Sequence, residues 1–212
     1  MHIQTEPYLQ QMPTWPQSGQ HILAHSDDDT IIVYQAYRPS IANYVIKNQH
    51  FGGDFKLSRM SWIKPNFLWM MYRCGWATKD GQESVLAIRL KKTFFEEILS
   101  LAVVSSFEKG DYPSLEAWQL AVNSSEVRLQ WDPDHDPLGQ KVERRSIQLG
   151  LRGKLLHRYA QEECLEIIDI TPFVIQQRMH LRDGFINLLT PAETLYLPNN
   201  LKISEQVGID LY

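Results

Sequence analysis

The sequence predicts an α+β fold built on one mixed or split β-sheet of about six strands with short helices. Two observations support this: runs of β-branched and aromatic residues alternate with short helical patterns, and the late strands follow one another without full crossover helices. With 212 residues, 43% of them apolar, the chain can bury one sizeable core. We therefore expect an extended N-terminal arm over residues 1–28, pinned by Trp15, and a single domain over residues 29–212 with a proline-punctuated C-terminal tail.

The first strand is the clearest element. Residues 30–37 read TIIVYQAY, which is the composition of a buried strand, and Arg38-Pro39 ends it because proline has no amide hydrogen for a ladder. A short helix is expected over residues 40–49. Residues 55–61 alternate in polarity, which predicts a second strand.

The later elements follow from the same signals. Pro65 suits the first turn of a helix that Gly75 ends, since the missing amide hydrogen of proline costs nothing there. A strand is expected over residues 84–90, and a helix over residues 93–104 with Thr93 as its N-cap. The remaining predictions are helices at 115–122, 153–160 and 172–182, and strands at 126–131, 145–151 and 164–170.

Composition excludes several classes of protein. A net charge of −4, from 21 basic and 25 acidic side chains, argues against a protein that coats nucleic acid with a generally basic surface. Cys74 and Cys164 are the only cysteines, and they favour a reducing compartment. Neither a secretory signal nor an apolar run near the roughly 20 residues that span a bilayer is visible, so we expect a cytoplasmic protein without a membrane partner. The histidines show no metal-ligand spacing, and no metal is expected.

Residues 52–79 concentrate cationic and aromatic side chains. The cations are Lys56, Arg59, Lys64, Arg73 and Lys79, and the aromatic residues include Trp62, Phe67, Trp69, Tyr72 and Trp76. Cations beside flat rings suit a ligand with phosphate at one end and a planar base at the other, such as a nucleotide or single-stranded nucleic acid. Core aromatics with a solvated cationic rim would produce the same pattern, and the sequence leaves both interpretations open.

Two other groups of cations could bind phosphate. Arg38 ends the first strand at a sheet edge, where a guanidinium can bind a phosphate or carboxylate, or else form a surface ion pair. A second basic segment supplies Arg145, Arg152 and Lys154, which together with Arg59 are the expected contacts to phosphate or nucleic acid. The alternative is two unrelated basic surfaces.

One acidic segment has the spacing of a calcium-binding loop. Asp132, Asp134, Asp136 and Glu143 stand at its first, third, fifth and twelfth positions. Pro137 occupies the sixth position, where the loop needs the conformational freedom of glycine, and this excludes an EF-hand. We expect a turn whose aspartates accept hydrogen bonds from its own amides, with an irregular cation site as the alternative.

Four long strings resemble one known family. DDDTIIVYQAYRPSIANYV, FGGDFKLSRMSWIKPNFLWMMYRCGWATKDGQESVLAIRL, VRLQWDPDHDPLG and RRSIQLGLRG together look like the family of domain of unknown function 4291. The resemblance runs from about His25 to Arg182 and implies no assigned activity.

A weaker resemblance concerns the order of the elements, which is similar to the layout of ADP-ribosyltransferases. In that layout an arginine on the first strand and a serine or threonine pair on the second hold NAD. The resemblance implies that Arg38 binds a phosphate or ribose of NAD and that Ser58 and Ser61 serve the ribose region. It also implies a late carboxylate that stabilises the ribosyl cation, a role for which Glu163 and Gln148 compete.

The sequence therefore favours a nucleotide-using transferase that resembles NAD-dependent ADP-ribosyltransferases. Its expected catalytic residues are Glu163 and Arg38, and its expected NAD-binding residues are Arg38, Ser58, Ser61, Trp62, Lys64 and Tyr72. The first alternative is an RNA or single-stranded nucleic-acid processing or binding protein without NAD chemistry. The second is a structural domain whose aromatic residues all lie in the core.

Overall fold

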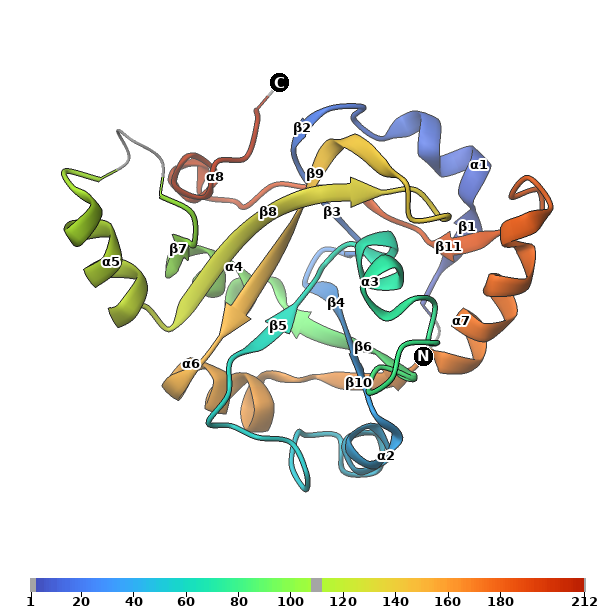
Figure 1. Cartoon of the computed structure of the whole chain (residues 1–212), viewed down its shortest axis with the longest axis horizontal. Coiled ribbons are helices and arrows are strands. Elements are labelled where there is room, and N and C mark those ends of the chain that lie inside the picture. The colour runs from blue at the N-terminus through green and yellow to red at the C-terminus, as the bar shows by residue number, and fades with distance from the viewer. Residues whose placement is uncertain (1–2, 108–111, 212) are drawn as a thin grey trace.

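The computed structural model describes residues 3–107 and 112–211, which form a mixed α and β structure with eight α-helices and twelve strands (Figure 1). Three antiparallel strands make one sheet, in the order β10 (Glu166–Asp169), β6 (Ser84–Lys91) and β4 (Thr30–Tyr37). A mixed sheet has the order β2 (Gly19–Gln20), β9 (Lys141–Leu151), β8 (Val127–His135) and β7 (Ala102–Val104), with β5 (Ser61–Ile63) also paired to β9. The long β8–β9 hairpin, in yellow, crosses the view in Figure 1.

A backbone bridge between Tyr34 and Lys64 connects the two sheets. The amide of Tyr34 donates to the carbonyl of Lys64 at 2.7 Å, and the amide of Lys64 donates to the carbonyl of Tyr34 at 3.3 Å. Because Lys64 directly follows β5, the mixed sheet meets the edge of β4 there. The strands consequently curl around a common interior rather than forming one flat sheet.

The strand β4 lies between two hydrophobic cores, which explains its continuous apolar sequence. Ile31 and Val33 point into a core shared with β8 and β9. Ile32 and Tyr34 point to the other side, into a core that includes much of α3 (Phe67–Cys74). Successive side chains of a strand point to opposite faces, so a strand buried on both faces needs apolar residues at every position.

Helices cover these sheets, and the two ends of the chain pair with each other. The remaining helices are α1 (Tyr8–Gln11), α2 (Pro39–Asn48), α4 (Lys92–Ser100), α5 (Leu115–Ser124), α6 (Gly153–Arg158), α7 (Thr171–Arg178) and α8 (Leu201–Val207). The strand β1 (Thr5–Pro7) pairs with β11 (Leu189–Pro191), and β3 (Ile22–Ala24) pairs with β12 (Thr194–Tyr196). Trp15 is buried, and its indole Nε1 donates to the carbonyl of Glu193 at 2.9 Å. None of the helices in the described residues is both long and apolar enough to cross a bilayer.

The predicted mixture of helices and strands is confirmed, whereas the predicted count of about six strands is too low. The prediction of strand 30–37 matches β4, and the prediction of 84–90 matches β6 to within one residue. The additional strands β1, β2, β3, β7, β11 and β12 contain two or three residues each. Such short pairings are held by long-range contacts, and they leave almost no periodic signal in the sequence.

Several predicted boundaries are wrong, each for a local reason. Residues 55–60 form turns, and only residues 61–63 of that region pair as a strand. The predicted helix 93–104 ends at Ser100 because residues 102–104 pair in parallel with β8; its N-cap is Lys91, without a side-chain cap, rather than Thr93. The helix predicted to start at Pro65 instead has Asn66 as its N-cap, whose side chain accepts from the amide of Trp69 at 2.7 Å.

The strand predicted to end before Asp132-Pro133 continues to His135. Pro133 is tolerated because β8 pairs only with β9 at that point, since β7 reaches no further than Leu129. The missing amide hydrogen of the proline therefore falls on an unpaired edge.

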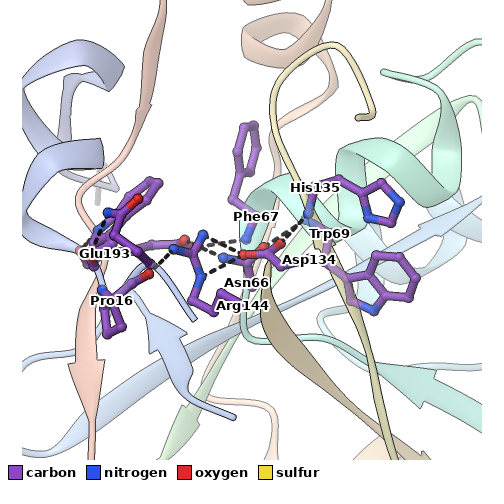
Figure 2. A network of polar contacts seen from close by, with 10 residues as sticks. Pro16, Asn66, Phe67, Trp69, Asp134, His135, Arg144 and Glu193 are labelled. Carbon is purple, nitrogen blue, oxygen red and sulfur yellow. Dashed lines mark hydrogen bonds and ion pairs between the residues drawn. The ribbon is translucent and has the colours of Figure 1, made fainter. Parts of the chain in front are cut away.

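Buried polar groups attach the C-terminal segment to the start of α3 (Figure 2). Glu193 is 3% exposed, and its carboxylate accepts from the amide of Phe67 at 2.7 Å and from Nδ2 of Asn66 at 3.1 Å. Burial raises the pKa of Glu193 well above its ordinary value, and its oxygens satisfy donors that the first turn of α3 would otherwise leave unpaired.

A buried ion pair closes the far end of the β8–β9 hairpin. Arg144 donates from Nη2 to Oδ2 of Asp134 at 2.6 Å and from Nε to the same oxygen at 2.9 Å (Figure 2). Its Nη1 donates to the carbonyl of Pro16 at 2.6 Å, and its guanidinium lies 5.5 Å from the ring centroid of Trp15. The pair thereby joins the hairpin to the N-terminal segment.

We expect Asp134→Ala to lower the free energy of unfolding by about 3–5 kcal/mol, because it leaves the buried guanidinium of Arg144 without a counter-charge. The matched control is Asp54→Ala, which removes one partner of an ion pair whose side chains are 54% and 56% exposed and should cost less than about 1 kcal/mol. Urea unfolding at neutral pH measures both changes. Equal losses in the two variants would contradict the assigned role of the buried pair.

Candidate functional site

A glycine pair allows the segment after α2 to form one wall of a hollow. A side chain at Gly52 would bring its Cβ to 2.7 Å from the ring of Tyr44, and one at Gly53 would come to 2.9 Å, at a backbone φ of +61°. Both positions therefore favour glycine, because the chain passes against Tyr44 and turns back. The turns of residues 54–60 follow directly.

The first hollow, of about 390 Å³, lies between these turns and the end of β4. Its charged lining residues are Arg38, Asp54, Lys56 and Arg59. Arg38 and Asp54 form an exposed ion pair at 3.2 Å. The floor includes Tyr37, Phe55 and Ser61.

A second, smaller hollow of about 190 Å³ adjoins the first. Tyr37, Met60 and Ser61 line both, so the two hollows form one cleft with a shared floor. Lys64 and Arg73 bring positive charge to the second hollow. We refer to the two hollows together as the basic cleft.

Lys64 is the most unusual group in the basic cleft. It is 6% exposed, and no acceptor in the described residues takes a hydrogen bond from its Nζ. Burial, and to a lesser extent the charge of Arg73, lower the pKa of Lys64 to about 7, while Asp132 acts in the opposite direction. Near neutral pH, a substantial fraction of this amine is therefore uncharged.

A chain of hydrogen bonds fixes the hydroxyl of Ser61 between the two hollows. The Tyr159 hydroxyl donates to Oε1 of Gln35 at 2.7 Å, and Nε2 of Gln35 donates to Oγ of Ser61 at 2.8 Å. Tyr37 and Ser61 hydroxyls lie 3.0 Å apart. Burial raises the pKa values of both tyrosines, so they stay protonated and can act as donors.

Trp62 lines the second hollow and rests on β9. A side chain at Gly150 would bring its Cβ to 2.7 Å from the sulfur of Met60 and to 3.0 Å from the ring of Trp62. Glycine within a strand often marks such a close approach. The half-buried indole consequently forms a flat apolar wall beside Lys64.

The basic cleft has a large excess of positive charge. Its described lining residues include five cations (Arg38, Lys56, Arg59, Lys64 and Arg73) and one acid, Asp54. Among the described residues, only Arg38 of these cations has an ion-pair partner. Unpaired cations around a concave surface attract anions and can contact phosphate directly.

The sequence-predicted residues Arg38, Arg59, Ser61, Trp62 and Lys64 thus come together in one cleft. Two functional neighbours were missed. The sequence analysis assigned Gln35 to an apolar strand and gave it no role in a site. A single amide side chain within the run TIIVYQAY nevertheless indicates a buried polar contact. Tyr159 had no signal, because its contact with Gln35 joins residues 124 positions apart in the chain.

Tyr72 and Ser58 lie outside this group. Tyr72 stacks on the ring of His135, with centroids 3.5 Å apart, and is absent from the described lining of both hollows. Ser58 is exposed and is absent from the described lining of both hollows. Neither side chain is positioned to complete the basic cleft.

The two candidates for a late acidic role also lie elsewhere. Glu163 forms an ion pair with Arg158 at 2.7 Å and is absent from the described lining of the basic cleft. Gln148 donates to Oε1 of Gln130 at 2.9 Å and to Oδ2 of Asp132 at 2.6 Å. The pairing of Ile63 with Leu149 brings the backbone of Gln148 level with Lys64, one residue beyond β5, but Gln148 is absent from the described lining of the basic cleft.

The second basic segment does not converge on the basic cleft. Arg145 donates to the carbonyl of Trp131 at 3.1 Å and lines a separate hollow. Arg152 donates to the carbonyls of Ser125 and Val122, and thus covers the end of α5. The exposed Lys154 follows the turn at the start of α6. These cations therefore have separate environments.

The three aspartates of the acidic segment point to different partners. Asp136 accepts from the amides of Leu138 and Gln140 at 2.9 and 2.8 Å, which confirms the expected turn for this residue. Asp134 is occupied by Arg144, and Asp132 by Gln148. Within residues 3–107 and 112–211, no group of three or more histidines, cysteines or acids is arranged to hold a metal ion.

Comparison with known proteins confirms the resemblance to the family of domain of unknown function 4291. The model of the family described as "Domain of unknown function (DUF4291)" matches residues 21–196, and this range contains every lining residue of the basic cleft named above. No curated protein matches the chain significantly. The match covers most of the 212 residues, and the chain therefore belongs to the DUF4291 family.

Proposed function

We propose that this protein is a cytoplasmic, nucleotide-using transferase whose basic cleft binds the phosphates of its ligand. The observation that carries the proposal is the group of cations Lys56, Arg59, Lys64 and Arg73, which have no ion-pair partner among the described residues. Phosphate groups are suited to such a site because several cations can share one ligand.

The shape and lining of the cleft support a nucleotide rather than a free phosphate. Together, the adjoining hollows offer room beyond the size of a phosphate group. Trp62, Tyr37 and Phe55 provide apolar surface against which a base or nicotinamide ring can lie. The hydroxyl of Ser61 is held between the hollows, where it can contact a ribose.

NAD remains the specific nucleotide suggested by the likeness to ADP-ribosyltransferases. The proximity of Arg38 and Ser61 supports it, since that layout assigns these two positions to NAD. The position of Glu163 does not, because its carboxylate pairs with Arg158 instead of facing the cleft. The proposal therefore rests on phosphate binding and assigns no role to Glu163.

We expect Arg59→Ala to weaken nucleotide binding by about 10- to 100-fold, the cost of one charge-assisted hydrogen bond to phosphate. The side chain is exposed and has no ion-pair partner among the described residues, so its loss should leave the fold intact. Isothermal titration calorimetry with ATP and with NAD measures the affinity, and nicotinamide release tests for NAD chemistry.

The matched control is Arg145→Ala, which removes an arginine from a separate hollow and should leave the affinity unchanged. Equal weakening by both variants would indicate general attraction of anions and contradict the assignment of the cleft. Salt-dependent binding of single-stranded RNA, with no binding of either nucleotide, would favour the nucleic-acid alternative instead.

We also expect Lys64→Met to stabilise the free protein at pH 7. The folded state lowers the pKa of Lys64 to about 7, whereas the unfolded chain restores its ordinary value of 10.5. Between these values the unfolded state binds the additional proton, so this group makes stability fall as the pH is lowered from 10.5 to 7. Methionine removes the free-energy cost of burying the amine, so the free energy of unfolding should rise by on the order of 2 kcal/mol.

Urea unfolding at pH 7 and at pH 9.5 measures this difference. The stabilisation by Lys64→Met should be smaller at pH 9.5 than at pH 7. The control variant is Lys56→Met, at an exposed position of the same cleft, and its effect on stability should not depend on pH in this way. A destabilised Lys64→Met at both pH values would mean that Lys64 serves the fold rather than a ligand.

A further inference from the structure

We propose that Lys64 is a covalent nucleophile, and that the transferase works in two steps through a nucleotide attached to its Nζ. The substrate class is a nucleoside triphosphate, and the attacked atom is its α-phosphorus. This inference rests on the proposed function, because it uses the same cleft and the same phosphate contacts.

The position of Lys64 distinguishes it from the other cations of the cleft. Arg59, Lys56 and Arg73 are exposed, so their side chains can reach a phosphate from solvent. Lys64 lies at the floor of the second hollow, 6% exposed, with no hydrogen-bond acceptor among the described residues. A lysine that served only to hold phosphate would gain nothing from such burial, since the burial removes its charge.

Burial and the charge of Arg73 favour the uncharged form of Lys64. Arg73 and Cys74 face it from α3, and Asp132 faces it from β8. The positive charge of Arg73 opposes protonation of the amine, while Asp132 favours it. Burial raises the pKa of the Cys74 thiol, so this sulfur is uncharged near neutral pH. An amine with a free lone pair beside a cation is the usual form of a nucleophilic lysine.

The first step transfers the nucleotide from the triphosphate to the lysine. The lone pair of Nζ forms a bond to the α-phosphorus, and the bond from that phosphorus to the oxygen of the β-phosphate breaks, so that pyrophosphate leaves with the electron pair. The nitrogen releases one proton to solvent and becomes a phosphoramidate. The cations of the first hollow, Arg59 and Arg38, lie across the shared floor and can stabilise the negative charge of the leaving pyrophosphate.

In the second step a hydroxyl of the acceptor attacks the same phosphorus. An oxygen–phosphorus bond forms, the nitrogen–phosphorus bond breaks, and the proton of the hydroxyl returns to Nζ. No oxidant or reductant is needed. The lysine is regenerated, and the nucleotide has moved to the acceptor.

The test is to incubate the protein with ATP, GTP, CTP or UTP carrying radioactive phosphorus at the α- or the γ-position, in a buffer with magnesium chloride. After denaturing electrophoresis, we expect label from the α-position to stay on the protein and label from the γ-position to be lost. The adduct should be labile in acid and stable in alkali, as phosphoramidates are. Peptide mass spectrometry should place it on Lys64.

Three variants test the assignment to Lys64. Lys64→Arg keeps a cation but offers no comparable nucleophile, and it should reduce the α-label to background; Lys154→Arg, outside the cleft, should label like the wild type. Arg73→Gln removes the neighbouring positive charge, so the midpoint of the pH–labelling curve should move to higher pH. Should Lys64→Arg fail to fold, the contrast between α- and γ-label and the mapped peptide still decide the question.

The outcomes separate this inference from the function on which it rests. Nucleotide binding by calorimetry without any α-label would overturn the nucleophilic role and leave the phosphate-binding cleft standing. Label on a residue other than Lys64 would overturn it as well. Absence of nucleotide binding would overturn both.

Discussion

The two backbone hydrogen bonds between Tyr34 and Lys64 are the constraint on which the rest of the structure depends. They join the three-stranded sheet to the mixed sheet, and they do so at the residue that carries the buried amine. The same junction sets Ser61 opposite Gln35 and Tyr37, because β5 runs beside the end of β4. The hydroxyl, the amine and the floor of the cleft are therefore consequences of one strand pairing rather than of separate loops.

This junction is unfavourable in one respect, and other parts of the molecule compensate for it. Burying Lys64 without an acceptor opposes folding. The segments around the cleft are held by buried polar groups that are well satisfied: Glu193 binds the start of α3, and Asp134 with Arg144 binds the hairpin to the N-terminal segment. Glu193 holds α3 through its first turn. The pair of Asp134 and Arg144 holds it through the neighbouring His135, on which Tyr72 stacks. Consequently Arg73 stays beside Lys64 without any direct bond between them.

The sequence predicted the helices and strands whose signals lie in consecutive residues. The short strands, by contrast, are determined by pairing with distant parts of the chain. The strands β4 and β6 were predictable because each is a continuous run of mainly apolar residues that is buried on both faces. The helix α3 was predictable because its apolar face is local in sequence and ends at Gly75. The expectation that residues 55–61 form a strand was wrong because alternation alone does not show whether a partner strand is available. For the site, residues 52–79 predicted the cations, but only the fold separates Lys64, which is buried, from Tyr72, which belongs to another stack.

The distribution of charge gives the strongest reason to treat the basic cleft as a site. Outside the cleft, three arginines of this acidic chain pair with carboxylates: Arg89 with Glu166, Arg144 with Asp134, and Arg158 with Glu97 and Glu163. In the described lining of the cleft the acid is Asp54, which pairs with Arg38, and the nearby Asp132 accepts a hydrogen bond from Gln148. A general excess of positive charge cannot explain this arrangement in an acidic protein. The phosphates of the ligand proposed above would supply the negative charge that the described lining of the cleft lacks.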